Sequence, residues 1–224
     1  MQYLKNELKE CKNFKNFHIK DAREVLPESE IFFDCKKNKY TIASFSDYFR
    51  YNMLYQNGGW WVDMDVICIK HFDLDSSFVF ATERHGEKLF SANCIIKGEK
   101  SSLFLDEPIK KSKNIIDKND YIPNKTLLDK ILKFLKLRKK KRKIKTINWG
   151  IIGPKFLDQE IKNASMESFL VKPELFCEID WFDAKKFIDP NYELPMDKNI
   201  RYYVADDTNL KIAKFLLRLF EKIA

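Results

Sequence analysis

Residues 44–68 read SFSDYFRYNMLYQNGGWWVDMDVIC and contain a predicted helix, a turn and a predicted strand in direct succession. Aromatic and Met side chains recur at helical spacing over residues 46–57, which indicates an amphipathic helix. Gly58 and Gly59 follow at the place where many helices end on a left-handed residue. Residues 60–69 are rich in Trp, Val and Ile, which is typical of a buried strand. We expect the rest of the chain to pack around this unit.

Two aspartates, Asp63 and Asp65, interrupt the apolar run of the predicted strand. Side chains two residues apart lie on one face of a strand, so both carboxylates would project together while Val62, Met64 and Val66 pack behind them. Two carboxylates at one site repel each other unless a cation or hydrogen-bond donors separate them. Mg²⁺ or Mn²⁺ would satisfy both and keep positions for the phosphate oxygens of a diphosphate. An exposed edge strand with two solubilising aspartates is the alternative, against which the neighbouring Trp and Val residues argue.

A second polar pair, Asp47 and Arg50, lies on the predicted helix just before the glycines. Residues three apart are neighbours on one helix face, and the short glycine turn lets that face look toward the end of the strand. A carboxylate beside a guanidinium group suits the hydroxyl groups of a sugar. The alternative is a surface ion pair, in which Asp47 only complements the helix dipole.

The run SDYFRYNMLYQNGGWWVDMDV resembles the DXD-containing sugar-binding region of family 32 glycosyltransferases and, more distantly, the glucosyltransferase domains of the large clostridial toxins. Its conjunction of Ser-Asp-x-x-Arg, Gly-Gly and Asp-x-Asp at fixed spacing is far more specific than a bare Asp-x-Asp. Asn93 resembles, less specifically, the family's Asn after the next strand, and the pair Gly153–Pro154 resembles its Gly-Pro loop; both occur in the same order as in the family. The resemblance implies a GT-A type α/β fold, with a central mixed sheet flanked by helices, in one domain over residues 1–224.

The same resemblance implies a metal-dependent, retaining glycosyltransferase that moves a hexose from a nucleotide-diphosphate sugar to a glycan or lipid-linked acceptor. It assigns donor-sugar binding to Ser46, Asp47, Arg50, Gly59 and Asn93, and catalysis with Mn²⁺ or Mg²⁺ binding to Asp63 and Asp65. The family commonly has a His before a Trp as a C-terminal metal ligand, where this chain reads VADDTNL. Asp206 or Asp207 is therefore expected to substitute as an oxygen ligand.

Two other functions compete with this hypothesis. The family's opening strand, which helps to hold the nucleotide, is not recognised here, so a degenerate, noncatalytic sugar-nucleotide-binding protein is the alternative. A metal-dependent nuclease would need more acidic or His ligands near the aspartates. We therefore expect no nucleic-acid partner.

Composition places the chain among globular, intracellular proteins. Its 224 residues are 45% hydrophobic, enough for one domain with a substantial core. The formal charge of +8 favours polyanionic partners, such as nucleotides or an anionic membrane surface. Five cysteines without a CxxC pair indicate reduced thiols in a cytosolic protein. The N-terminus lacks the apolar core of a signal peptide.

Two basic segments suggest peripheral contact with the inner face of a membrane. Residues 136–145 contain eight basic side chains in ten, which fits either a solvated loop or contact with phosphate or anionic lipid. Residues 208–224 predict an amphipathic helix, whose apolar face either packs on the body or lies on a membrane. The remaining predictions are helices over 2–16, 101–116 and 124–137 and strands over 31–34, 77–82, 93–97, 175–179 and 202–205, with a polar loop between the second and third strands.

Overall fold

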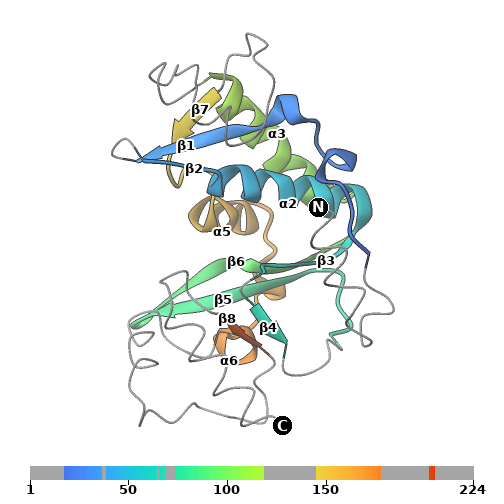
Figure 1. The fold of residues 1–224 in the computed structure, drawn as a ribbon. Helices are drawn as coiled ribbons and strands as arrows, with labels where there is room; N and C mark the ends of the chain where they lie inside the picture. The colour runs from blue at the N-terminus through green and yellow to red at the C-terminus, as the bar shows by residue number, and fades with distance from the viewer. Residues whose placement is uncertain are drawn as a thin grey trace, which may run out of the picture.

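The computed structural model describes residues 18–36, 39–64, 66–68, 74–118, 145–177 and 202–204. Its central element is helix α2 (Ala43–Asn57), which lies between two three-stranded sheets (Figure 1). One sheet has the order β2-β1-β7, in which β1 runs antiparallel to β2 and parallel to β7. The strands of this sheet are β1 (Phe32–Lys36), β2 (Lys39–Thr41) and β7 (Lys145–Asn148).

The second sheet is antiparallel and has the order β3-β6-β5. Its strands are β3 (Gly59–Val62), β5 (Val79–His85) and β6 (Lys88–Gly98). A third, two-stranded sheet pairs β4 (Val66–Cys68) with β8 (Tyr202–Val204). The fold is therefore mixed α/β, and its described strands form three small sheets where one central mixed sheet was expected.

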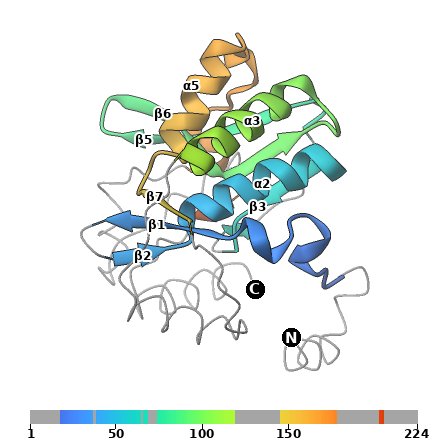
Figure 2. The same cartoon turned by 90° about the horizontal axis from the view of Figure 1, so that it is seen from above.

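Helices complete the layers around α2. Helix α3 (Leu103–Lys118) runs beside α2, and α5 (Pro154–Asn163) packs on β6 and α3 (Figure 2). Helix α6 (Pro173–Phe176) lies against β5 and β8. The described residues also form the short 3-10 helices η1 (Ala22–Glu24), η2 (Glu28–Glu30) and η3 (Glu167–Phe169).

The core has two parts, which lie on opposite faces of the β3-β6-β5 sheet. The larger part gathers around α2 and α3 and includes Tyr51, Phe80 and Phe104. The smaller part lies toward α6. Alternation along β3 sends Trp61 to the larger part and Trp60 to the smaller one. The two tryptophans therefore have different surroundings, although they are adjacent in sequence.

Helix α2 ends at the glycines, as predicted. Gly58 has φ +68°, and its N–H donates to the Leu54 carbonyl over 2.7 Å. A Cβ atom at this position would lie 2.9 Å from the backbone nitrogen of Lys100, so a side chain has no room there. Gly59 follows with φ +87° and starts β3. The chain can therefore pass from helix to strand without an intervening loop.

The other end of α2 is held by a residue distant in sequence. Asp34 in β1 is fully buried, and both of its carboxylate oxygens accept the Ser44 N–H at 3.1 Å. The Thr41 hydroxyl donates to the same carboxylate over 2.7 Å. Ile42, at the N-cap position, has no side-chain cap of its own. Asp34 therefore caps α2 from the neighbouring strand and complements the helix dipole.

We expect Asp34→Ala to lower the free energy of unfolding by roughly 2–3 kcal/mol, since hydrogen bonds to a buried charged group are lost. Asp34→Asn keeps one acceptor and should fall between Ala and the parent. Urea unfolding measures both variants, with Glu107→Ala on the exposed side of α3 as the control. A loss no larger than that of the control would show that Asp34 does not hold the helix.

The predicted strand over residues 60–69 is divided, because β3 ends before Asp63 and β4 begins at Val66. The Val66 N–H donates to the Asp63 carbonyl over 3.1 Å, which closes a tight turn. Asp is favoured at the first position of such turns. Met64 is fully exposed, so the prediction that it packs behind the aspartates is wrong. Asp65 lies outside the described residues.

Two other predictions are corrected. The polar loop expected between the strands over 77–82 and 93–97 is a β-hairpin, in which His85 pairs with Lys88. Its polar residues lie where the two strands leave the core, so polarity did not indicate a loop. The strand predicted over 175–179 begins within α6, because Pro173 occupies the first turn of a short helix.

Several predicted elements are confirmed. The strands over 31–34, 77–82, 93–97 and 202–205 and the helix over 101–116 correspond to β1, β5, β6, β8 and α3. The predicted helices over 2–16, 124–137 and 208–224 and most of the basic run 136–145 lie outside the described residues. Among the described helices, none is long and apolar enough to cross a membrane.

Candidate functional site

Four polar side chains meet where α2 crosses the β3-β6-β5 sheet, and we call Asp47, Arg50, Asp63 and Asn93 the α2 cluster. Arg50 Nη2 lies 3.1 Å from Asp47 Oδ1 and 3.4 Å from Asp63 Oδ1. Asn93 Nδ2 donates to Asp47 Oδ1 over 2.9 Å, and Arg50 Nη1 donates to the backbone carbonyl of Asn93. Side chains from the helix, from the end of β3 and from β6 thus form one network.

The α2 cluster is buried at one end and open at the other. The side chains of Asp47 and Arg50 are 10% and 6% exposed, whereas that of Asp63 is 29% exposed. The interpretation of Asp47 and Arg50 as a surface ion pair is therefore wrong. Charged groups this deep need partners, because burial removes their hydration. The cluster is thus buried at Asp47 and Arg50 and reaches solvent at Asp63.

Burial changes the ionisation of Asp47. Desolvation raises the pKa of this carboxyl to about 6, with smaller contributions from the charges of Asp63 and Asp34. Arg50 and Asn93 act in the opposite direction without cancelling the effect of burial. Asp47 thus changes charge within one or two pH units of neutrality. Such shifts are concentrated at functional sites, because function there requires a charge that stability alone would not favour.

Three buried polar atoms around the cluster have no hydrogen-bond partner within the described part of the chain, namely Arg50 Nε, Asn93 Oδ1 and Tyr51 Oη. Tyr51 is fully buried, and burial, followed by the Asp47 charge, raises the pKa of its hydroxyl. The Asn93 amide beside it acts the other way, but its geometry falls short of a hydrogen bond. Because buried polar atoms are almost always paired, a water or a polar ligand is expected to complete this site.

Asp63 presents its two carboxylate oxygens differently. The Trp61 Nε1–H donates to Oδ1 over 2.6 Å, and Arg50 approaches the same oxygen. No hydrogen bond engages Oδ2 among the described residues. Asp63 can therefore offer one oxygen to a cation or hydroxyl while the protein holds the other. This arrangement fits the carboxylate of a divalent-metal site, which needs further ligands from elsewhere.

Four other predicted site residues are not members of the α2 cluster. Ser46 Oγ is 3.5 Å from Arg50 Nη2, at the rim of the cluster. Gly59 is exposed at the start of β3 and brings no side chain. Asp65 and Asp206 lie outside the described residues, within which no group of three or more His, Cys, Asp or Glu side chains could hold a metal.

Residues that sequence reasoning did not assign to the site also contribute. Tyr51 lies four residues after Asp47 and hence on the same helix face, a spacing that could have identified it. The Gly153 backbone lies against the cluster, because a Cβ atom there would be 3.6 Å from Asp47 Oδ2. The loop before α5 therefore packs against the Asp47 side of the cluster. Trp61 gave no sequence signal beyond its apolar character.

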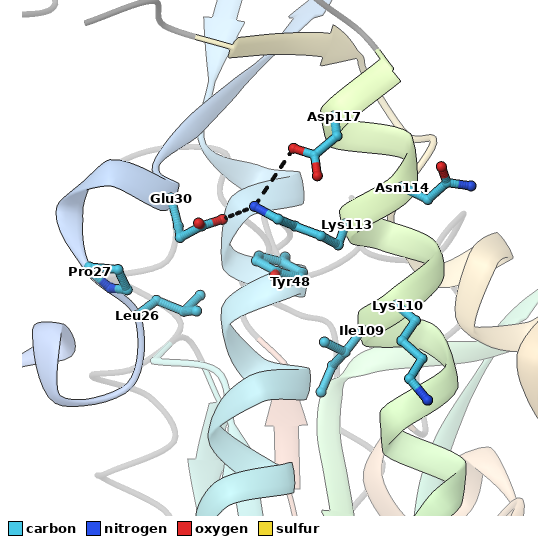
Figure 3. A pocket seen from close by; sticks show the side chains of 9 residues that line it. All are labelled: Leu26, Pro27, Glu30, Tyr48, Ile109, Lys110, Lys113, Asn114 and Asp117. Carbon is cyan, nitrogen blue, oxygen red and sulfur yellow. Dashed lines mark hydrogen bonds and ion pairs between the residues drawn. The ribbon is translucent and has the colours of Figure 1, made fainter.

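A hollow of about 610 Å³ lies between η2, α2 and α3 (Figure 3). Its lining residues are Leu26, Pro27, Glu30, Tyr48, Ile109, Lys110, Lys113, Asn114 and Asp117. Lys113 Nζ lies 2.6 Å from Glu30 and 3.7 Å from Asp117, and Lys110 pairs with Asp106. These charges already neutralise one another, and no member of the α2 cluster lines the hollow. We therefore take the α2 cluster as the candidate site.

Comparison with known families supports a sugar-binding role for this part of the chain. Residues 2–82 match the family model described as glycosyltransferase sugar-binding region containing DXD motif. The match includes Asp47, Arg50 and Asp63 and stops before Asn93. Searches of curated proteins and of solved structures gave no significant match. The segment 2–82 is thus similar to the sugar-binding region of DXD-containing glycosyltransferases, which indicates a glycosyltransferase-like function.

Proposed function

We propose that this protein is a metal-dependent, retaining glycosyltransferase that transfers a hexose from a nucleotide-diphosphate sugar to a glycan or lipid-linked saccharide. The observation that carries the proposal is the α2 cluster, a buried ionic network that lies mostly inside the matched region and opens at Asp63. A buried ionic network costs desolvation energy. Binding of a polar substrate would be a functional reason for the chain to keep such a network.

The graded burial suggests how the donor would lie. The buried end offers an acceptor in the Asp47 carboxylate and donors in the Arg50 guanidinium and Asn93 amide, a combination that suits sugar hydroxyls. The unpaired Asn93 Oδ1 and Tyr51 Oη would then find partners. The open end at Asp63 would face the diphosphate. In this orientation the sugar is fixed by several contacts before transfer, which lowers the entropic part of the barrier.

Asp63 and Asp65, with Asp206 as a further ligand, are the residues that would hold Mn²⁺ or Mg²⁺. The ion would neutralise negative charge on the departing nucleotide diphosphate. The contribution of the described residues is orientation, because Trp61 and Arg50 hold one Asp63 oxygen, and no hydrogen bond from the described residues engages the other.

A panel of nucleotide sugars tests the proposal, with nucleotide release measured in the presence of Mn²⁺ and again in EDTA. We expect release from one donor and its loss in EDTA. Calorimetric titration of the same donors separates the noncatalytic alternative, which binds a donor but releases no nucleotide. Absence of both binding and release across the panel would refute the glycosyltransferase proposal.

The raised pKa of Asp47 predicts that a rise in pH strengthens donor binding but lowers the stability of the fold. Donor binding should weaken about tenfold between pH 7.5 and 5, because protonation near pH 6 removes the charge of Asp47. Its folded-state pKa is raised from 3.8, so the folded protein binds the proton more tightly than the unfolded chain does. Asp47 therefore costs stability as pH rises from about 4 to about 6, by up to about 3 kcal/mol.

Urea unfolding of the parent and of Asp47→Asn at pH 4.5 and 7.5 measures this contribution to stability, with Asp75→Asn, which removes an exposed carboxylate, as the control. The difference in unfolding free energy between Asp47→Asn and the parent should shift in favour of the variant at the higher pH. The same difference at both pH values would contradict the assigned ionisation of Asp47.

Membrane contact and a cytoplasmic location remain proposals from sequence alone. Residues 208–224, and all of the basic run but Lys145, lie outside the described residues. The two proposals rest on the net charge of +8 and on the amphipathic pattern of the C-terminal segment. A membrane-bound location would suit a lipid-linked acceptor.

A further inference from the structure

Trp61 joins the two ends of the α2 cluster. Its ring lies with its centroid 5.0 Å from the Arg50 guanidinium carbon, and its Nε1–H donates to Asp63 Oδ1 over 2.6 Å. Phe49 packs against the same ring, with a centroid separation of 6.1 Å. One side chain thus contacts the buried arginine, through its ring, and the open carboxylate, through its N–H. The sequence did not predict such a bridging role for Trp61 or for any other residue of the segment 44–68.

We infer that Trp61 is a positioning residue, which fixes the Asp63 carboxylate relative to Arg50 and thereby decides which Asp63 oxygen is presented to a divalent cation. The inference rests on the proposed function, since it concerns the orientation of a proposed metal ligand. It goes beyond that function in naming a neutral side chain that sets the orientation.

The position of Asp63 explains why orientation needs support. Asp63 follows the last residue of β3 in a tight turn, and its side chain is 29% exposed. A carboxylate in such a place rotates between alternative orientations unless donors hold it. Trp61 and Arg50 both approach Oδ1, so Oδ2 is the oxygen left for a cation.

The chemistry of the indole group distinguishes it from that of Arg50. An indole N–H only donates and carries no charge, so Trp61 orients Asp63 without neutralising it. Arg50 alone would hold the carboxylate mainly by charge, which competes with a cation for the same group. Outer partners that hydrogen-bond to a ligating carboxylate typically change metal affinity or activity 10–100-fold when removed. The N–H of Trp61, rather than the bulk of its ring, is therefore the important feature.

Sequence provides a matched control in the adjacent residue. Trp60 lies on the opposite face of β3, where it packs against Phe176 at 6.5 Å and near Lys97 Nζ at 5.5 Å. Trp60→Phe and Trp61→Phe make the same chemical change in the same strand. Both keep an aromatic ring and remove an indole N–H, but Trp61→Phe alone removes the hydrogen bond to Asp63.

The test is the dissociation constant of Mn²⁺ itself, measured by electron paramagnetic resonance on the full chain without donor, after circular dichroism has shown that each variant is folded. We expect Trp61→Phe to weaken Mn²⁺ binding roughly 10–100-fold and Trp60→Phe to change it less than about threefold. Trp61→Tyr, whose hydroxyl is a donor, should recover part of the loss.

A double-mutant cycle isolates the pair. In an Asp63→Ala background, Trp61→Phe should cause no further loss of Mn²⁺ affinity, because the group that it orients is gone. Equal effects of Trp61→Phe and Trp60→Phe, or an undiminished effect of Trp61→Phe in the Asp63→Ala background, would overturn the positioning role alone. A parent protein that does not bind Mn²⁺ would overturn the proposed metal site, and the inference with it.

Discussion

Asp65→Asn is expected to slow sugar transfer on the order of a thousandfold while the fold is retained. The substitution keeps the shape and one carbonyl oxygen but removes the charge proposed to hold Mn²⁺ or Mg²⁺. Lewis-acid assistance at a leaving phosphate is worth several kcal/mol, and a loss of about 4 kcal/mol corresponds to this factor. Nucleotide release from the preferred donor at saturating Mn²⁺ measures the effect.

Two comparisons make this result specific to the metal. EDTA on the parent should reproduce the rate of Asp65→Asn, since chelation removes the metal and the substitution removes the charge proposed to hold it. Asp75→Asn, which removes an exposed carboxylate ten residues further along the chain, should leave the rate close to that of the parent. Metal-independent activity, or an Asp65→Asn rate within about threefold of the parent, would overturn both the metal site and the assigned reaction class.

Arg50→Ala is expected to lower the free energy of unfolding by roughly 3–5 kcal/mol, the usual cost of leaving a buried ionic partner unpaired. Arg50 lies within 3.4 Å of both Asp47 and Asp63, and Asp47 is buried. Its removal leaves two carboxylates facing each other without a cation. The loss should be larger above pH 6, where Asp47 is charged, than at pH 4.5. Urea unfolding at both pH values gives the magnitude.

Arg84→Ala is the matched control, because Arg84 pairs with Glu174 at a position where the two side chains are 30% and 42% exposed. Such an exposed pair contributes about 1 kcal/mol or less. Arg50→Lys keeps the charge but loses the planar fork that contacts several acceptors, so it should weaken donor binding more than it weakens the fold. If Arg50→Ala and Arg84→Ala cost the same, the α2 cluster is not the buried network described here.

Local chemistry was enough to predict the helix–turn–strand unit and its polar pair. The end of α2 at Gly58 follows from the preference of glycine for positive φ, which depends on one residue and its immediate neighbours. The proximity of Asp47 and Arg50 follows from helical spacing alone. The same holds for the amphipathic α3 helix, predicted over 101–116 and observed as Leu103–Lys118. These features require no knowledge of how distant segments pack.

Predictions failed where an apolar or polar composition suits more than one structure. The Trp- and Val-rich run after the glycines could form one strand, but the turn closed by Asp63 and Val66 divides it. The polar segment predicted as a loop between residues 82 and 93 forms the paired ends of β5 and β6, because cross-strand hydrogen bonds compensate for its poor burial. Composition describes the preference of each residue, whereas pairing depends on which strand is available nearby.

The site itself depends on contacts between residues far apart in the chain. Helical spacing predicted that Asp47 and Arg50 are neighbours, but their burial results from β6, whose Asn93 lies 46 residues from Asp47. The indole N–H of Trp61 and the capping carboxylate of Asp34 acquire their roles in the same way, from the packing of β3 and β1 around α2. Hydrophobic burial brings these segments together without regard to their polar groups, and the resulting desolvation raises the pKa of Asp47. Residue types and local spacing thus specify which groups are present, whereas long-range packing specifies how deeply they are buried and which of them meet.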